Sequence, residues 1–150
     1  MYIATFNSSG GNLVSYTNTE LSITELQVKK RNYYPNAVCF EITQTQHGQL
    51  KDGWEGSESG GVVTVTEPAG WLNGYKAEAK EKEKKKGVRL FKKYRDDIAN
   101  SDANISTYKS NLKAYFISDV KNPIELRATN TKQKVDDIIK LVDWSSVVIS

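Results

Sequence analysis

The sequence predicts an α+β fold, in which an N-terminal antiparallel β section precedes about three helices and a short C-terminal strand. Apolar and polar residues alternate in several segments of residues 1–70, and this alternation is the period of half-buried strands. From Trp71 onward the apolar period lengthens to about 3.6 residues, which is typical of amphipathic helices. A chain of 150 residues has the size of one ordinary domain. We therefore predict a single domain over residues 1–150 that is β-rich over 1–70, helical over 71–143 and extended over 144–149.

The β section contains four segments with strand patterns, near residues 2–6, 13–17, 37–44 and 61–67. The polar segment NSSGGN lies between the first two and predicts a hairpin loop. In the third strand, Val38, Phe40 and Ile42 are expected to share one face, opposite Cys39.

Two segments between the strands receive different predictions. Residues 22–31 stay open between helix and strand, because Ser22 and Glu25 have the spacing of a capping box while the β-branched residues of the segment favour a strand. Residues 47–61 are so rich in glycine and polar residues that a loop is predicted. The glycine-rich stretch GSESGGVV lacks a Lys-Ser/Thr ending and leads into a strand, which excludes a phosphate-binding loop.

Three segments have helical patterns, near residues 72–99, 104–118 and 131–143. The apolar residues that define their buried faces are Leu90, Phe91, Tyr94, Ile98, Ile105, Tyr108, Leu112, Tyr115, Phe116, Val135, Ile138, Ile139 and Val142. Pro123 is expected to separate the second helix from the third. The tail WSSVVIS predicts a last strand that returns the chain to the β section, and this return argues for one domain.

The most charged segment of the chain is KAEAKEKEKKKGVRLFKK, residues 76–93, although the net charge of the whole chain is only +3. Glu78–Lys82 and Glu81–Lys85 have the favourable i,i+4 order of helical ion pairs. Since no apolar residue lies between Ala79 and Val88, we expect a solvated helix with no core beneath it.

The excess of cations in this segment supports a second interpretation, in which the helix contacts a phosphate backbone or an acidic protein subunit. The residues that would form this surface are Lys84, Lys85, Lys86, Arg89, Lys92 and Lys93. Base stacking is not indicated, because Phe91 and Tyr94 belong to the apolar face of the helix.

Few residues are suited to catalysis or metal binding. His47 is the only histidine and Cys39 the only cysteine, and no G-x-S-x-G motif is present. We expect no catalytic residue, no cofactor and no metal, a loop position for His47 and a small buried hydrophobe at Cys39. An enzyme whose carboxylate pair assembles only on folding is the third hypothesis for function.

Aromatic residues outside the clear apolar patterns are candidate interface anchors. Tyr33, Tyr34, Trp54 and Trp71 lie in or beside predicted loops, where Trp and Tyr often anchor protein interfaces. For Trp71, a lid over the sheet is an equally good interpretation.

These observations favour a non-enzymatic structural or assembly protein, with a nucleic-acid-binding accessory protein that uses residues 80–93 as the alternative. The abundant Asn, Ser and Thr and the missing catalytic set resemble small accessory components of virus particles, such as phage tail or capsid proteins. The expected partners are protein subunits of a homo- or hetero-oligomeric assembly, or nucleic acid, and not a membrane. The start MYIATFNSSGG lacks a basic region followed by an apolar one, so we expect no secretory signal and a place in the virion or the cytoplasm.

Overall fold

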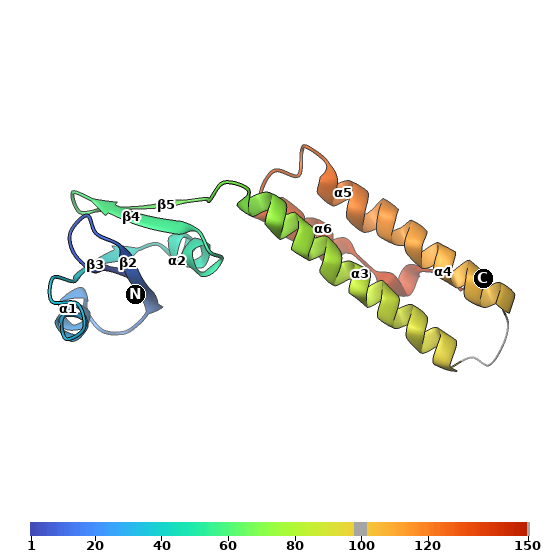
Figure 1. Ribbon diagram of the computed structural model, residues 1–150, viewed down its shortest axis with the longest axis horizontal. Helices are drawn as coiled ribbons and strands as arrows, with labels where there is room; N and C mark the ends of the chain where they lie inside the picture. The colour runs from blue at the N-terminus through green and yellow to red at the C-terminus, as the bar shows by residue number, and fades with distance from the viewer. Residues whose placement is uncertain (98–101, 150) are drawn as a thin grey trace. The chain divides into compact units, whose positions relative to one another are not determined.

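The computed structural model describes residues 1–97 and 102–149. The fold is α+β, as predicted, with antiparallel strands in the N-terminal part followed by helices. The chain divides into two compact units, Met1–Ala69 and Gly70–Ser150 (Figure 1). We call them the N-terminal unit and the helical unit.

The N-terminal unit is built on a three-stranded antiparallel sheet. Its central strand β1, Tyr2–Phe6, pairs on one side with β2, Leu13–Asn18, and on the other with β3, Val38–Ile42. Alternate side chains of β1 enter two separate cores, so that Ile3 lies on one face of the sheet and Ala4 on the other.

One face of the sheet is covered by helix α1, Ile23–Arg31, which packs Leu26 against Ile3 and Cys39. Residues 22–31, for which the sequence left helix and strand open, thus form a helix, and the predicted capping box is present at its start. The Ser22 hydroxyl accepts a hydrogen bond from the Glu25 backbone N–H at 3.3 Å, and the Glu25 carboxylate accepts one from the Ser22 N–H at 2.8 Å.

The other face is covered by helix α2, Gln44–Lys51, and by a hairpin of β4, Glu55–Ser59, and β5, Val62–Thr66. The prediction of a loop over residues 47–61 was therefore wrong. A second capping box, between Thr43 and Gln46, starts α2, and the buried side chain of Leu50 holds this helix on the sheet.

Glu58 joins this hairpin to the loop after β1. Its buried carboxylate accepts hydrogen bonds from the backbone N–H groups of Gly10, at 2.5 Å, and Gly61, at 2.6 Å. Gly61 and the preceding Gly60 form the hairpin turn with positive φ angles of 83° and 59°. Chiefly the Gly10 bond, and then the Gly61 bond, hold the pKa of Glu58 below its ordinary value, although burial acts in the opposite direction.

Protonation of Glu58 is therefore expected to weaken the N-terminal unit in acid. Because the folded-state pKa is depressed, the stabilisation is complete above the unfolded-state pKa and is lost as the pH falls through the folded-state value. We expect Glu58→Gln to lower the urea midpoint of this unit at pH 7 and to make the midpoint less sensitive to pH in the acid range. The Gly10 and Gly61 amide signals in NMR spectra report this unit directly. Glu41→Gln, at an exposed position of β3, is the control and is expected to leave both properties unchanged.

The helical unit begins with the long helix α3, Trp71–Asp97, against which α4, Asp102–Tyr115, and α6, Lys132–Leu141, both pack (Figure 1). A π-helical turn η1, Phe116–Lys121, and the short α5, Asn122–Glu125, extend α4 beyond the predicted end near residue 118.

Pro123 does not end this helical run; it lies in the first turn of α5, directly after the π-helical turn η1. The helical stretch ends after Glu125 instead, where Leu126 takes up an extended backbone conformation. Ile98, predicted on the apolar face of the first long helix, lies outside the described residues.

The predicted C-terminal strand is wrong. Residues Trp144–Ser146 form a single 3₁₀ turn, η2, and residues 147–149 have no regular structure. This tail packs on the helices, because Trp144 and Val147 contact the core of the helical unit and the Asn111 amide donates a hydrogen bond to the Val148 carbonyl at 2.9 Å. The single domain was predicted because a C-terminal strand was expected to return to the β section. Without that strand this argument is lost, and the single domain remains an untested prediction.

Candidate functional site

The charged segment of α3 has a buried side that the sequence did not reveal. Ala79, Glu83, Gly87 and Phe91 recur every four residues and therefore share one side of the helix, which continues to Tyr94. All five positions are buried or half-buried. The expectation of a solvated helix with no core beneath it is thus wrong for this side of α3.

Trp144, from the C-terminal tail, packs against this buried side of α3. Its indole N–H donates a hydrogen bond to Glu83 Oε2 at 2.8 Å, while Lys86 Nζ donates to Glu83 Oε1 at 2.6 Å. Glu83 is only 2% exposed, so the indole N–H and the ammonium group satisfy a carboxylate that water scarcely reaches. The Trp144 ring lies on Gly87, where an added Cβ would come within 2.8 Å of it, and it also lies against the Tyr115 ring, 5.1 Å between centroids.

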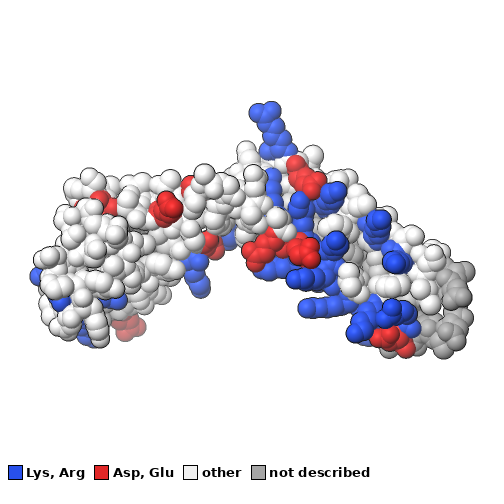
Figure 2. Space-filling model, in the orientation of Figure 1, with Lys and Arg blue, Asp and Glu red and all other residues white. Residues whose placement is uncertain are grey.

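The opposite side of α3 carries a strong excess of positive charge. Residues 82–95 contain eight Lys and Arg residues and a single acidic residue, Glu83, which is turned toward the core. The outer surface of this segment therefore presents basic side chains with no acidic residue of its own. In Figure 2, Lys and Arg side chains gather densely over the helical unit where Figure 1 places α3.

Most of the predicted cationic residues share one face of α3. At 100° per residue, this face comprises Lys82, Lys85, Lys86, Arg89, Lys92 and Lys93, and we call it the basic face. All six side chains are exposed. Lys84, which was also predicted as part of the surface, is exposed but points to a different side of the helix.

Only part of the basic face is neutralised by ion pairs. The predicted Glu78–Lys82 pair is present at 3.0 Å, and Lys86 pairs with the buried Glu83. Within the described part of the chain, Lys85, Arg89 and the remaining lysines of the face form no ion pair, and the predicted Glu81–Lys85 pair is not made.

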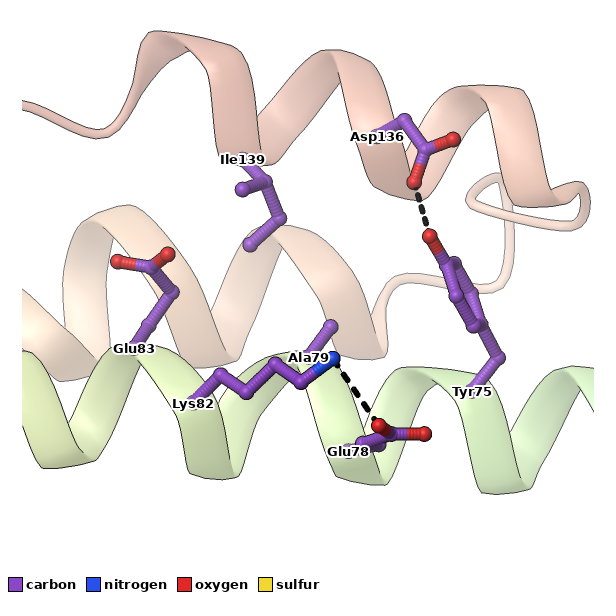
Figure 3. A pocket seen from close by; sticks show the side chains of 7 residues that line it. All are labelled: Tyr75, Glu78, Ala79, Lys82, Glu83, Asp136 and Ile139. Carbon is purple, nitrogen blue, oxygen red and sulfur yellow. Dashed lines mark hydrogen bonds and ion pairs between the residues drawn. The ribbon is translucent and has the colours of Figure 1, made fainter.

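A small groove of about 110 Å³ lies between α3 and α6. The groove is lined by Tyr75, Glu78, Ala79, Lys82, Glu83, Asp136 and Ile139 (Figure 3). Each of its carboxylates has a donor as partner: Lys82 for Glu78, Lys86 and Trp144 for Glu83, and the Tyr75 hydroxyl for Asp136. Of these contacts, only the bond from Tyr75 to Asp136 joins α3 to α6. Together they give every carboxylate of the groove a partner.

The four predicted interface aromatics have different environments. Trp54 is half-buried just before β4, and Trp71 stacks on Tyr75 of its own helix, with centroids 5.2 Å apart and planes 6° from parallel. Tyr33 and Tyr34 remain on the surface, where they are 80% and 40% exposed. Of the four predicted anchors, Tyr33 and Tyr34 are therefore the two whose side chains are exposed to solvent.

Tyr33 and Tyr34 follow α1 in a fixed turn. Both backbone N–H groups donate to the Lys30 carbonyl, at 3.0 and 2.9 Å, and the Ala37 N–H donates to the Tyr34 carbonyl at 2.9 Å. The Arg31 guanidinium also donates to the Ala37 carbonyl, at 3.2 Å. We call Tyr33 and Tyr34, with the basic residues 29–31 before them, the aromatic corner.

The side chains of His47 and Cys39 both contact other side chains of the N-terminal unit. His47 lies in α2, not in the predicted loop, and its ring is 4.9 Å from the Tyr2 ring and 5.7 Å from the Tyr16 ring, centroid to centroid. Cys39 is buried, as predicted, and its thiol is 3.2 Å from the Thr5 hydroxyl.

Among residues 1–97 and 102–149, no three His, Cys, Asp or Glu residues are placed to hold a metal ion. No helix in the same residues is both long and apolar enough to span a bilayer. No family model, curated protein or solved structure matches the chain.

Proposed function

We propose that the chain is a non-enzymatic structural protein that assembles into a multi-subunit complex, and that the aromatic corner docks on the neighbouring subunit. The exposure of Tyr33, 80% of whose surface is accessible, is the observation that carries this proposal. A tyrosine held at a fixed turn offers a large contact area and loses little side-chain freedom on binding, which is why tyrosines recur as interface anchors. The composition favours a small accessory component of a virus particle as the kind of assembly.

The charges of the N-terminal unit favour a second copy of the chain as the partner. This unit contains four basic and seven acidic residues, and three of the four basic residues belong to the aromatic corner. Its exposed acidic residues are Glu20, Glu25, Glu41, Asp52, Glu55 and Glu67. In Figure 2, the basic atoms seen on this unit lie mostly where Figure 1 places α1.

A basic corner on an otherwise acidic unit makes two copies complementary to each other. The corner of one copy would contact the acidic surface of the next, so that different patches meet. Contacts of this kind between unlike patches close into rings or extend into filaments. Both are architectures of structural assemblies.

Sedimentation equilibrium tests this proposal. We expect the wild-type chain to form a species heavier than its monomer mass of 16.8 kDa. The double variant Tyr33→Ala/Tyr34→Ala is expected to raise the dissociation constant at least about tenfold, because truncation of two anchor residues is expected to cost more than about 1.4 kcal/mol of binding free energy.

Val62→Ala is the matched control, because Val62 is 65% exposed at the hairpin of the same unit and lies outside the corner. This variant is expected to associate like the wild type. A wild-type chain that stays at 16.8 kDa up to about 100 μM, or a double variant that associates normally, would refute self-assembly through the corner.

A further inference from the structure

We propose that the basic face of α3 binds the phosphate backbone of double-stranded nucleic acid without regard to sequence. This inference concerns the helical unit and does not depend on self-assembly through the aromatic corner. It rests on three features of the basic face: its length, its excess of Lys and Arg over acidic residues, and the absence of aromatic rings from it.

The length of the basic face suits a duplex backbone. Lys82 and Lys93 are eleven residues apart on a continuous helix, which corresponds to about 16 Å along its axis. This distance is about half of one duplex turn. A rigid helix of this length can therefore place several cations beside neighbouring phosphates of one strand.

The inward turn of Glu83 removes the one acidic residue of the segment 82–95 from the surface, so that the acidic residues nearest the basic face, Glu78 and Asp96, lie at its two ends. If Glu83 were on the surface, it would lie one turn from Lys86 and repel a phosphate nearby. Instead its carboxylate is buried against Trp144 and pairs with Lys86, whose side chain is 56% exposed. The helical unit as a whole has 17 basic and 11 acidic residues, so its average charge also attracts a polyanion.

The absence of aromatic residues from the basic face favours a duplex over a single strand. Phe91 and Tyr94 point into the core with Tyr108 and Leu112, as the sequence predicted, and so offer no surface on which bases could stack. Binding through phosphates alone is independent of sequence and strongly dependent on salt.

Fluorescence anisotropy with a labelled duplex of about 20 base pairs tests the proposal, with a DNA and an RNA duplex of the same sequence as separate arms. We expect binding to both duplexes, or to one of them, at low salt, with a steep loss as salt rises from about 50 to 200 mM. The triple variant Lys85→Gln/Arg89→Gln/Lys92→Gln is expected to weaken binding at least about tenfold at low salt and to lower the salt slope by about two to three. Glutamine is a good helix former, so the far-UV circular dichroism of this variant is expected to match the wild type.

Lys84→Gln is the matched control, because Lys84 is an exposed lysine of the same segment that lies off the basic face. It removes one charge and is expected to leave the salt slope unchanged. An unlabelled poly-glutamate of similar total charge serves as the competitor and is expected to displace the duplex poorly.

Three results would overturn the proposal. The first is no binding to either duplex at about 50 mM salt and 100 μM protein, where non-specific binders are readily detected. The second is an equal effect of Lys84→Gln and of any single substitution within the basic face. The third is displacement by poly-glutamate as efficient as by unlabelled duplex, which would identify an acidic protein as the partner.

Discussion

Trp144→Ala is expected to destabilise the helical unit by about 2–4 kcal/mol, the larger of the two strongest effects that the structure predicts. The substitution removes a ring that packs on Gly87, on Tyr115 and on the core formed by Tyr94 and its neighbours. It also removes the indole donor of a carboxylate that is almost fully buried, and a buried acceptor without its donor costs free energy. Urea unfolding followed by circular dichroism at 222 nm measures the loss.

Trp144→Phe separates the two contributions. A phenyl ring keeps much of the packing but cannot donate to Glu83, so a smaller loss of about 1–3 kcal/mol is expected. A Trp144→Ala variant as stable as the wild type would show that the tail does not pack on the helices.

Gly87→Ala is expected to destabilise the same unit by about 1 kcal/mol or more, although alanine normally stabilises a helix. The added Cβ would meet two atoms of the Trp144 ring at 2.8 and 2.9 Å. The ring is held by its bond to Glu83 and by its contact with Tyr115, so it has little room to move away. The clash is therefore expected to outweigh the gain in helix propensity.

Gly74→Ala provides the control within the same helix. No atom lies within 4 Å of a Cβ added at Gly74, so only the helix propensity changes and a gain of about 0.5–1 kcal/mol is expected. The two alanine substitutions thus have opposite predicted signs. If Gly87→Ala also stabilised the unit, the close approach of Trp144 would be refuted.

Those parts of the fold that depend on local pattern could be predicted from the sequence. The alternation of Val38, Cys39 and Phe40 correctly placed β3 between two cores, because the period of a strand is visible in the residues themselves. The period of 3.6 residues likewise located the long helices. Helix α2 was missed, since its start depends on a Thr43–Gln46 capping box in a segment whose polar composition favoured a loop.

Parts that depend on distant residues could not be predicted in this way. Glu83 reads as a surface residue because the donor that allows its burial, Trp144, is 61 residues away in the chain. One feature of the sequence signals that another side chain packs closely here: Gly87, four residues after Glu83, is a glycine in the middle of a helix. The six basic residues that the sequence proposed as one surface are all exposed, but only the turn of α3 shows that Lys84 lies apart from the others.

Light scattering coupled to size-exclusion chromatography tests the central claim most directly, namely that the chain is an assembly protein with a separate basic face. The wild-type chain would be compared with and without a duplex of about 20 base pairs, at about 50 and 300 mM salt. We predict a species heavier than 16.8 kDa without nucleic acid, and a further gain in mass with the duplex at the lower salt only. A monomer of 16.8 kDa whose mass does not change under any of these conditions would contradict the account.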